Sequence, residues 1–235
     1  LRMDASGPPL LLQRATLRRA GEIGLVAVAY VASARLSQAF AVEVGPGNVS
    51  PVWIPSGLLL AWALRRGLWI WPGVFFGAGF GNAWAYFDAS APGVALRALG
   101  AGAANGLGDV LCIIGGAWAF LRLGDAQARL SGPRAATVFV VAACVLGPLV
   151  SALAGVGGLL VFGFADHADQ GVADALFATW WMGDGVGALL LTPFFLAWTA
   201  RPRALAPGRR LEVVGLGAAA AVIIQPMLSV AATVM

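Results

Sequence analysis

The fold of this chain is decided by the stretch Thr179-Trp-Trp-Met-Gly-Asp-Gly-Val-Gly-Ala-Leu-Leu-Leu-Thr-Pro193. It contains one carboxylate, Asp184, in a run that is otherwise apolar enough to cross a lipid bilayer. An acid at the centre of a bilayer costs about 2.5 to 3.5 kcal/mol on insertion scales. We therefore expect Asp184 to have a partner in a neighbouring helix or a functional role.

Composition places the whole chain in a membrane. Of its 235 residues, 60% are hydrophobic and 11% are charged, and the mean hydropathy is +0.83. A soluble domain needs a far more polar surface. At about 20 residues per span, a chain of this length allows about seven or eight transmembrane helices. We expect an all-α fold, a polytopic transmembrane helical bundle.

Seven apolar runs follow a polar amino-terminal segment, residues 1–19, and the integral membrane domain occupies residues 20–235. The expected spans are Ala20–Val42, Val52–Leu64, Leu68–Phe87, Gly93–Phe120, Ala135–Gly163, Ala175–Trp198 and Leu211–Met235. No small-residue cleavage site follows the amino-terminal segment, so we expect it to be retained. The number of spans is odd and the seventh runs to the last residue, Met235. We therefore expect that an eighth span is missing after Met235.

The arginines predict the orientation, because cytoplasmic loops collect basic residues. Every arginine except Arg35 and Arg97 lies in the amino-terminal segment or in a connection on the same side. The opposite connections carry acids instead: Glu43, Asp88, Asp166, Asp169 and Asp174. We therefore expect a cytoplasmic amino terminus.

Several classes of function are excluded or unsupported. The chain has no lysine, which excludes a retinal Schiff base, and its single histidine, His167, excludes a bis-histidine haem. Cys112 and Cys144 lie in separate apolar runs without metal-ligand spacing, so we interpret them as packing residues. No hydrolase triad, phosphate-binding glycine loop or nucleic-acid motif is present. We expect no catalysis, no cofactor, no metal site and no nucleic-acid partner.

Polar side chains within the spans predict a polar core. At 1.5 Å per residue, Asp184 lies about 13 Å below the outer end of its span and Arg35 about 10 Å below that of the first. Arg97, Asn105 and Asp109 share one stripe of the fourth span, with Asp109 about 20 Å from the outer end. The candidate ligand-binding or structural polar core is Arg35, Asn82, Arg97, Asn105, Asp109 and Asp184.

This core has two interpretations that the residues leave open. A pairing of Asp184 with Arg35 or Arg97 would be a structural staple that fixes helix register. Alternatively, two arginines facing one nearby acid leave surplus positive charge, which suits a small anionic or zwitterionic ligand. Conduction of protons or ions is a third possibility, although a relay needs more titratable groups than Asp109 and Asp184.

Tryptophans and glycines add two smaller expectations. The tryptophans near the outer surface belong either to an interfacial belt or to a pocket wall: Trp53, Trp180 and Trp181. Glycines spaced four residues apart should admit a close neighbouring helix: Gly73, Gly77 and Gly81.

The motifs together resemble a known family. They are Val52-Trp-Ile-Pro-Ser-Gly-Leu58, Trp71-Pro-Gly-Val-Phe-Phe-Gly-Ala78, Gly81-Asn82, Asn105 with Asp109, and Trp181-Met-Gly-Asp-Gly-Val-Gly187 with Pro193. Over about residues 20 to 235 the chain resembles the first type of membrane-associated sensor domain. That family is the integral membrane input module of bacterial histidine kinases and diguanylate cyclases. Two departures are Trp-Ile-Pro, where the family typically has Trp-Pro-Pro, and Asp109, where it has glutamate.

The resemblance implies a sensory domain of two-component or cyclic di-GMP signalling in the bacterial inner membrane, here without its own output domain. Combined with the polar core, it predicts a small ligand in an outer-facing pocket. One alternative is a stand-alone structural or accessory subunit that contacts the bilayer and other membrane subunits or copies of itself. A small transporter or channel is another.

Overall fold

The computed structural model describes residues 10–44, 47–84, 87–127, 130, 132–165 and 170–199. The chain divides into two units, Leu1–Leu196 and Ala197–Met235. The expected seventh span, Leu211–Met235, lies outside the described residues.

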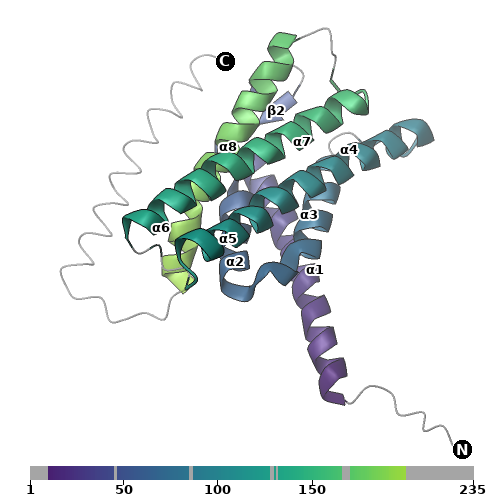
Figure 1. Cartoon of the computed structure of the whole chain (residues 1–235). Helices are drawn as coiled ribbons and strands as arrows, with labels where there is room; N and C mark the ends of the chain where they lie inside the picture. The colour runs from purple at the N-terminus through teal and green to yellow at the C-terminus, as the bar shows by residue number, and fades with distance from the viewer. Residues whose placement is uncertain are drawn as a thin grey trace, which may run out of the picture. The chain divides into compact units, whose positions relative to one another are not determined.

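The described part is a bundle of six helices with one small hairpin (Figure 1). Four of the helices are α1 (Leu10–Gln38), α2 (Ile54–Arg66), α3 (Trp71–Ala83) and α8 (Gln170–Thr199). A fifth runs without a break through α4 (Pro92–Val110), η2 (Leu111–Gly115), α5 (Gly116–Ala119) and η3 (Phe120–Gly124). The sixth runs through α6 (Pro133–Val138), η4 (Phe139–Leu146) and α7 (Gly147–Val161). Between α1 and α2, strands β1 (Val42–Val44) and β2 (Gly47–Val49) pair antiparallel, and η1 (Leu68–Ile70) is one turn before α3.

Four helices are long and apolar enough to cross a membrane: Thr16–Gln38, Pro92–Gly124, Pro133–Val161 and Gly171–Thr199. They coincide with the expected first, fourth, fifth and sixth spans, and they confirm an α-helical multi-pass membrane fold.

The expected second and third spans correspond to the short helices α2 and α3. Helix α2 is as long as the run Val52–Leu64 that predicted it, whereas α3 is shorter than the run Leu68–Phe87. Each helix has 13 residues, which is about 20 Å at 1.5 Å per residue, against a hydrocarbon core of about 30 Å. Gly67 separates them with a φ of 102°, a left-handed conformation that favours glycine. The seven-span count therefore does not follow from helix length alone.

Glycines bring the helices into close contact. α3 packs along both α1 and α4, and α4 packs along α7. A Cβ on Gly73 would lie 2.6 Å from the Ile23 carbonyl oxygen, and one on Gly77 would lie 2.6 Å from the Tyr30 Cβ. At Gly81 the nearest atom would be 3.6 Å away. The glycine ladder of α3 is thus directed at α1 of the same chain.

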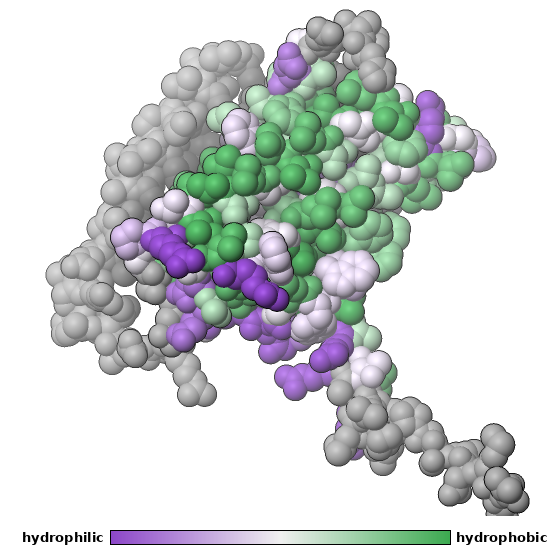
Figure 2. All heavy atoms as spheres, viewed as in Figure 1, coloured by the Kyte–Doolittle hydropathy of each residue, from purple (hydrophilic) through white to green (hydrophobic). Residues whose placement is uncertain are grey.

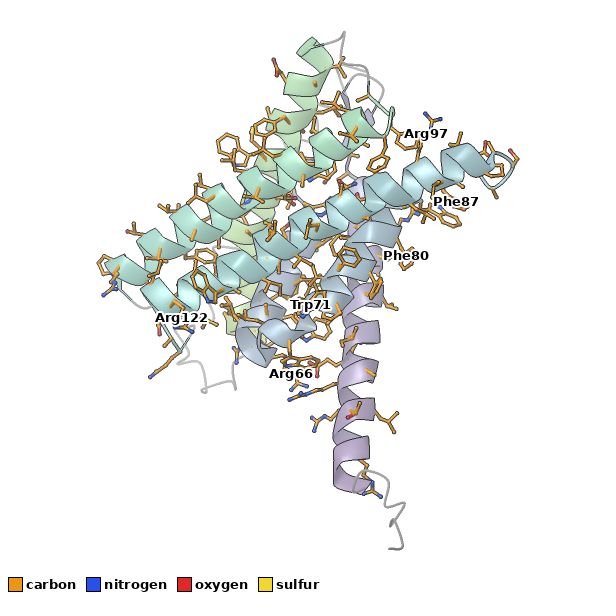
Figure 3. The ribbon with its side chains drawn as sticks, turned by 45° about the vertical axis from the view of Figure 1, so that its right-hand side comes forward. Arg66, Trp71, Phe80, Phe87, Arg97 and Arg122 are labelled. Atoms are coloured by element: carbon orange, nitrogen blue, oxygen red, sulfur yellow. The ribbon has the colours of Figure 1, made fainter. Side chains whose placement is uncertain are left out.

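Large apolar side chains cover much of the outside. Figure 2 shows a hydrophobic surface across the helices, with hydrophilic residues gathered below it. Large apolar side chains that are exposed include Phe76, Phe80, Trp84, Leu96, Leu107, Trp118 and Leu153. Arg66 and Arg122 lie at one end of the helices and Arg97 lies toward the other (Figure 3). An apolar belt between two polar ends is the surface expected of a protein in a bilayer.

Pro148 does not break its helix. It follows the π-helical segment η4 and stands in the first turn of α7. Proline has no amide proton to donate to a carbonyl of the preceding turn. A π-helical turn before it is one way for the helix to continue past the proline. The carbonyl oxygen of Cys144, in that widened turn, faces Gly185 of α8, where a Cβ would lie 2.6 Å from it.

Candidate functional site

The chain between α1 and α2 enters the bundle and meets α8 near the middle of that helix. The backbone amide of Trp53 donates to the Gly183 carbonyl at 2.9 Å. The backbone amide of Ile54 donates to Ser37 Oγ at 2.9 Å. At 1.5 Å per residue, Gly183 lies about 20 Å from the start of α8. Irregular backbone is tolerated at such depth only where protein or water surrounds it, so α2 begins inside the bundle.

The glycines of α8 form a groove for this entering backbone. A Cβ on Gly187 would lie 2.1 Å from the Trp53 carbonyl oxygen, and one on Gly183 would lie 2.5 Å from that of Ser50. Across the groove, a Cβ on Gly57 would lie 2.3 Å from the Gly187 carbonyl oxygen. The repeated glycines around Asp184 therefore serve a contact between two backbones.

Asp184 lies in this groove, opposite the first turn of α2. Its side chain is 0% exposed, and its Oδ1 accepts a hydrogen bond of 2.5 Å from Ser56 Oγ. The positive end of the α2 dipole also favours a carboxylate here. Oδ2 has no hydrogen-bond partner within the described ranges.

Asp109 is the second buried acid, 3% exposed on α4. Ser151 Oγ donates to its Oδ1 at 2.8 Å, and the hydroxyl of Tyr30 donates to its Oδ2. Trp53 Nε1 in turn donates to the Tyr30 hydroxyl oxygen at 3.2 Å. Asp109 thus connects α1, α4 and α7, with Trp53 attached through Tyr30.

The two acids belong to one cluster. Ser151 is next to Asp184 as well as Asp109, and the two carboxyl groups are near enough to interact electrostatically. Asn105, one turn before Asp109, is 2% exposed, and its Oδ1 has no partner in the described part of the chain. We call the cluster the polar junction; its members are Tyr30, Ser56, Asn105, Asp109, Ser151 and Asp184.

The predicted arginine partners of Asp184 lie elsewhere. Neither Arg35 nor Arg97 forms a salt bridge with Asp184 in the described ranges, and both are exposed. Arg35 donates to Gln38 Oε1 at 3.5 Å, and the Arg97 guanidinium lies 5.8 Å from the ring centroid of Phe164. Among the described residues, the staple that one interpretation gave is therefore not formed, because Asp184 faces α2 and α7 whereas the long side chains of these arginines reach the exterior.

The remaining predicted residues also lie outside the cluster or at its edge. Asn82 Nδ2 donates to the Ala78 carbonyl of its own helix at 3.0 Å. A Cβ on Gly155 would lie 2.6 Å from the ring of Trp180, and Trp181 Nε1 donates to the Val145 carbonyl at 3.0 Å. These two tryptophans attach α8 to the helix that contains α7. Trp53, by contrast, touches the junction, with its ring edge-to-face against Tyr30.

Three junction residues were not predicted from the sequence: Tyr30, Ser56 and Ser151. Ser56 lies in the motif Val52–Leu58, which marked the segment without giving this residue a role. For Tyr30 and Ser151 the only signal in the sequence is a hydroxyl in an apolar run. A hydroxyl can satisfy itself on its own helix, as Ser33 does on the Ala29 carbonyl at 2.7 Å. Its presence alone therefore does not mark a site.

A different kind of polar contact occurs where α1 meets the end of α2. The guanidinium of Arg66 donates two hydrogen bonds of 2.6 Å to the Glu22 carboxylate. Trp62 Nε1 donates to the same carboxylate at 3.2 Å. Here the acid has a cationic partner, so the contact is a staple of the kind that one interpretation of the sequence gave for Asp184.

The chemistry of the junction is that of hydroxyl, amide and carboxyl groups. Among the described residues, no group of three or more His, Cys, Asp or Glu side chains could hold a metal ion. Cys112 and Cys144 are both buried and free. The cluster joins several membrane helices through hydrogen bonds, which is an arrangement for coupling their positions.

Comparison with known families agrees with this architecture. The family model MASE1 matches residues 23–235. The chain belongs to the MASE1 family. The resemblance expected from the sequence motifs is thereby confirmed, and as a MASE1 domain the chain is a multi-pass, non-catalytic sensory input domain of signalling proteins. Comparisons with curated proteins and with solved structures gave no match.

Proposed function

We propose that this MASE1 domain reports a stimulus from the outer side of the bacterial inner membrane by changing how α2 packs against α8. In this proposal the amino terminus is cytoplasmic and the chain crosses the membrane seven times. The observation that carries the proposal is the polar junction, whose hydrogen bonds join α1, α2, α4, α7 and α8.

The start of α2 is the part of the bundle suited to two arrangements. Its first turn is attached to α8 by the Trp53 amide and by the Ser56 hydroxyl, and to α1 by Ser37. A small displacement of α2 breaks these bonds together, because all three lie within one turn. A stimulus favours one arrangement only if it has a different affinity for each.

We further propose a small anionic or zwitterionic molecule as the stimulus, bound at the outer rim where Arg97 is exposed. Its guanidinium lies over Phe164 and has no salt-bridge partner in the described ranges. Guanidinium groups bind carboxylates and phosphates in a bidentate manner. Arg35, also exposed and near the end of α1, is a second candidate contact. In this proposal the small molecule binds at the arginines, and Asp184 transmits the signal without contacting the molecule.

The test uses the full chain in lipid nanodiscs and a panel of small carboxylates, phosphates and amino acids. We expect at least one compound to raise the melting temperature and to change amide hydrogen exchange in residues 50–57. Arg97→Gln should remove both effects, whereas Arg122→Gln, at the opposite end of the helices, should leave them unchanged. A compound that binds through Arg97 without altering exchange in residues 50–57 would contradict transmission through α2.

The alternative of an accessory subunit has less support. One surface that such a subunit would use is the glycine face of α3, and that face packs on α1 of the same chain at Gly73 and Gly77.

A further inference from the structure

The polar junction contains two carboxyl groups and no basic side chain in the described part of the chain. The one salt bridge among the described residues joins Arg66 to Glu22, and neither of these residues belongs to the polar junction. The other titratable groups around the two acids are the Tyr30 hydroxyl from α1 and the buried thiols of Cys112 and Cys144. None of these supplies a positive charge.

A pair of acids in this position needs a positive partner. Removing charges from water is costly, and the cost is recovered only by an opposite charge with good hydrogen bonds. The start of α2 contributes the equivalent of about half a positive charge at its amino end. That is less than two carboxylates require.

Two buried oxygens of the polar junction are available as ligands for such a partner. Asp184 Oδ2 and Asn105 Oδ1 are both buried, and neither has a hydrogen-bond partner in the described ranges. On α4, Gly106 faces Phe75 of α3 and Gly108 faces Ser151 of α7. Asn105 lies on the face of α4 between these two contacts and on the same stripe as Asp109. Because side chains of a helix point toward its amino end, the side chain of Asp109 is directed toward Asn105.

We propose that the polar junction binds one small hard cation, a proton or a sodium ion, between Asp109 and Asp184 and next to the Asn105 amide oxygen. Carboxylate, amide and hydroxyl oxygens are the ligands that hard cations prefer. The cation joins α4 to α8, and its release lets the two acids repel each other beside the start of α2. The consequence for signalling rests on the proposed function, whereas the binding itself does not.

The experiment measures binding on the full chain in nanodiscs, without any signalling readout. Infrared difference spectroscopy detects the C=O stretch of a protonated carboxyl group at neutral pH. Melting temperature in sodium chloride against choline chloride, at equal ionic strength and pH, detects sodium. We expect one of these signals in the wild type and its loss in Asp184→Asn, which keeps the side-chain shape.

Two further variants control the result. Asp88→Asn should change neither signal, because Asp88 is exposed and hydrogen bonds from the Ser90 side chain and backbone lower its pKa. Asn105→Leu should weaken the binding about tenfold, in the range seen when groups supporting a bound ion are removed. It also provides a readout if Asp184→Asn fails to fold.

The infrared band identifies a proton and the sodium-dependent melting temperature identifies sodium. If the wild type shows neither signal, or if the signal persists in both Asp184→Asn and Asn105→Leu, the proposal is overturned. Failure of the outer-ligand test leaves these readouts unaffected, so the two proposals fail separately.

Discussion

Glu22 and Asp184 are both acids within helices long enough to span a membrane, and the structure treats them differently. Glu22 receives two hydrogen bonds from the Arg66 guanidinium and one from Trp62. Asp184 is fully buried, receives one hydrogen bond from Ser56 and has a second acid as its charged neighbour. Among the described residues, the first acid has a cationic partner and the second has none.

The difference separates a structural contact from a candidate functional one. A compensated acid holds two helices together whatever else is present. An acid without a cation holds its helices together only while something else supplies positive charge. The junction is therefore the part of the bundle whose stability should depend on conditions.

The largest effect is expected where the backbones of α2 and α8 meet. Gly187→Leu places a side chain on a Cβ position only 2.1 Å from the Trp53 carbonyl oxygen. We expect a loss of about 3 kcal/mol or failure to fold, because the obstacle is backbone. Gly157→Leu is the matched control, since nothing lies within 4 Å of its Cβ position. Melting temperature and size-exclusion behaviour in detergent measure both variants, and equal tolerance of the two would contradict the groove.

An intermediate effect is expected from the hydroxyl that connects Trp53 to Asp109. Tyr30→Phe removes a donor to the Asp109 carboxylate and an acceptor for Trp53 Nε1. We expect a loss of about 1 to 3 kcal/mol, the cost of leaving buried polar groups unpaired. Ser33→Ala serves as the control because the Ser33 hydroxyl donates to carbonyls of its own helix, those of Ala29 and Tyr30. If thermal unfolding shows the two variants to be equally stable, the hydrogen bonds of Tyr30 do not hold the junction.

The smallest effect is expected from the compensated acid. Glu22→Gln removes an ion pair whose arginine side chain is 46% exposed, and exposed pairs contribute little to stability. We expect a small fall in melting temperature that shrinks further at high salt. Arg66→Gln should match it. A fall as large as that of Tyr30→Phe would erase the distinction between the two acids.

Much of the bundle could be predicted from the sequence, because long apolar runs and arginine-rich connections are strong signals. The sequence also placed Asn105 and Asp109 on one stripe and marked Asp184 as unusual. The run Val52–Leu64 is as short as α2, so hydropathy indicated that length. The shortness of α3 could not be read from hydropathy, because the run Leu68–Phe87 continues beyond the end of the helix at Ala83. The small hairpin before α2 was likewise missed.

The partners of the acids were the harder part. An arginine was expected beside Asp184 because opposite charges attract, yet helix depth alone does not say which faces meet. The sequence shows that glycines flank Asp184, but the contact of Gly187 with the backbone of Trp53 appears only in three dimensions.

Asp184→Asn tests most directly whether the junction lacks a cationic partner of its own. We would measure its free energy of unfolding against the wild type in sodium-free, alkaline buffer, where few protons and no sodium ions are available. We expect the variant to be at least as stable as the wild type, because the repulsion between Asp109 and Asp184 is removed. A loss of about 3 to 5 kcal/mol, the usual result of removing one member of a buried ion pair, would show that Asp184 already has a cationic partner.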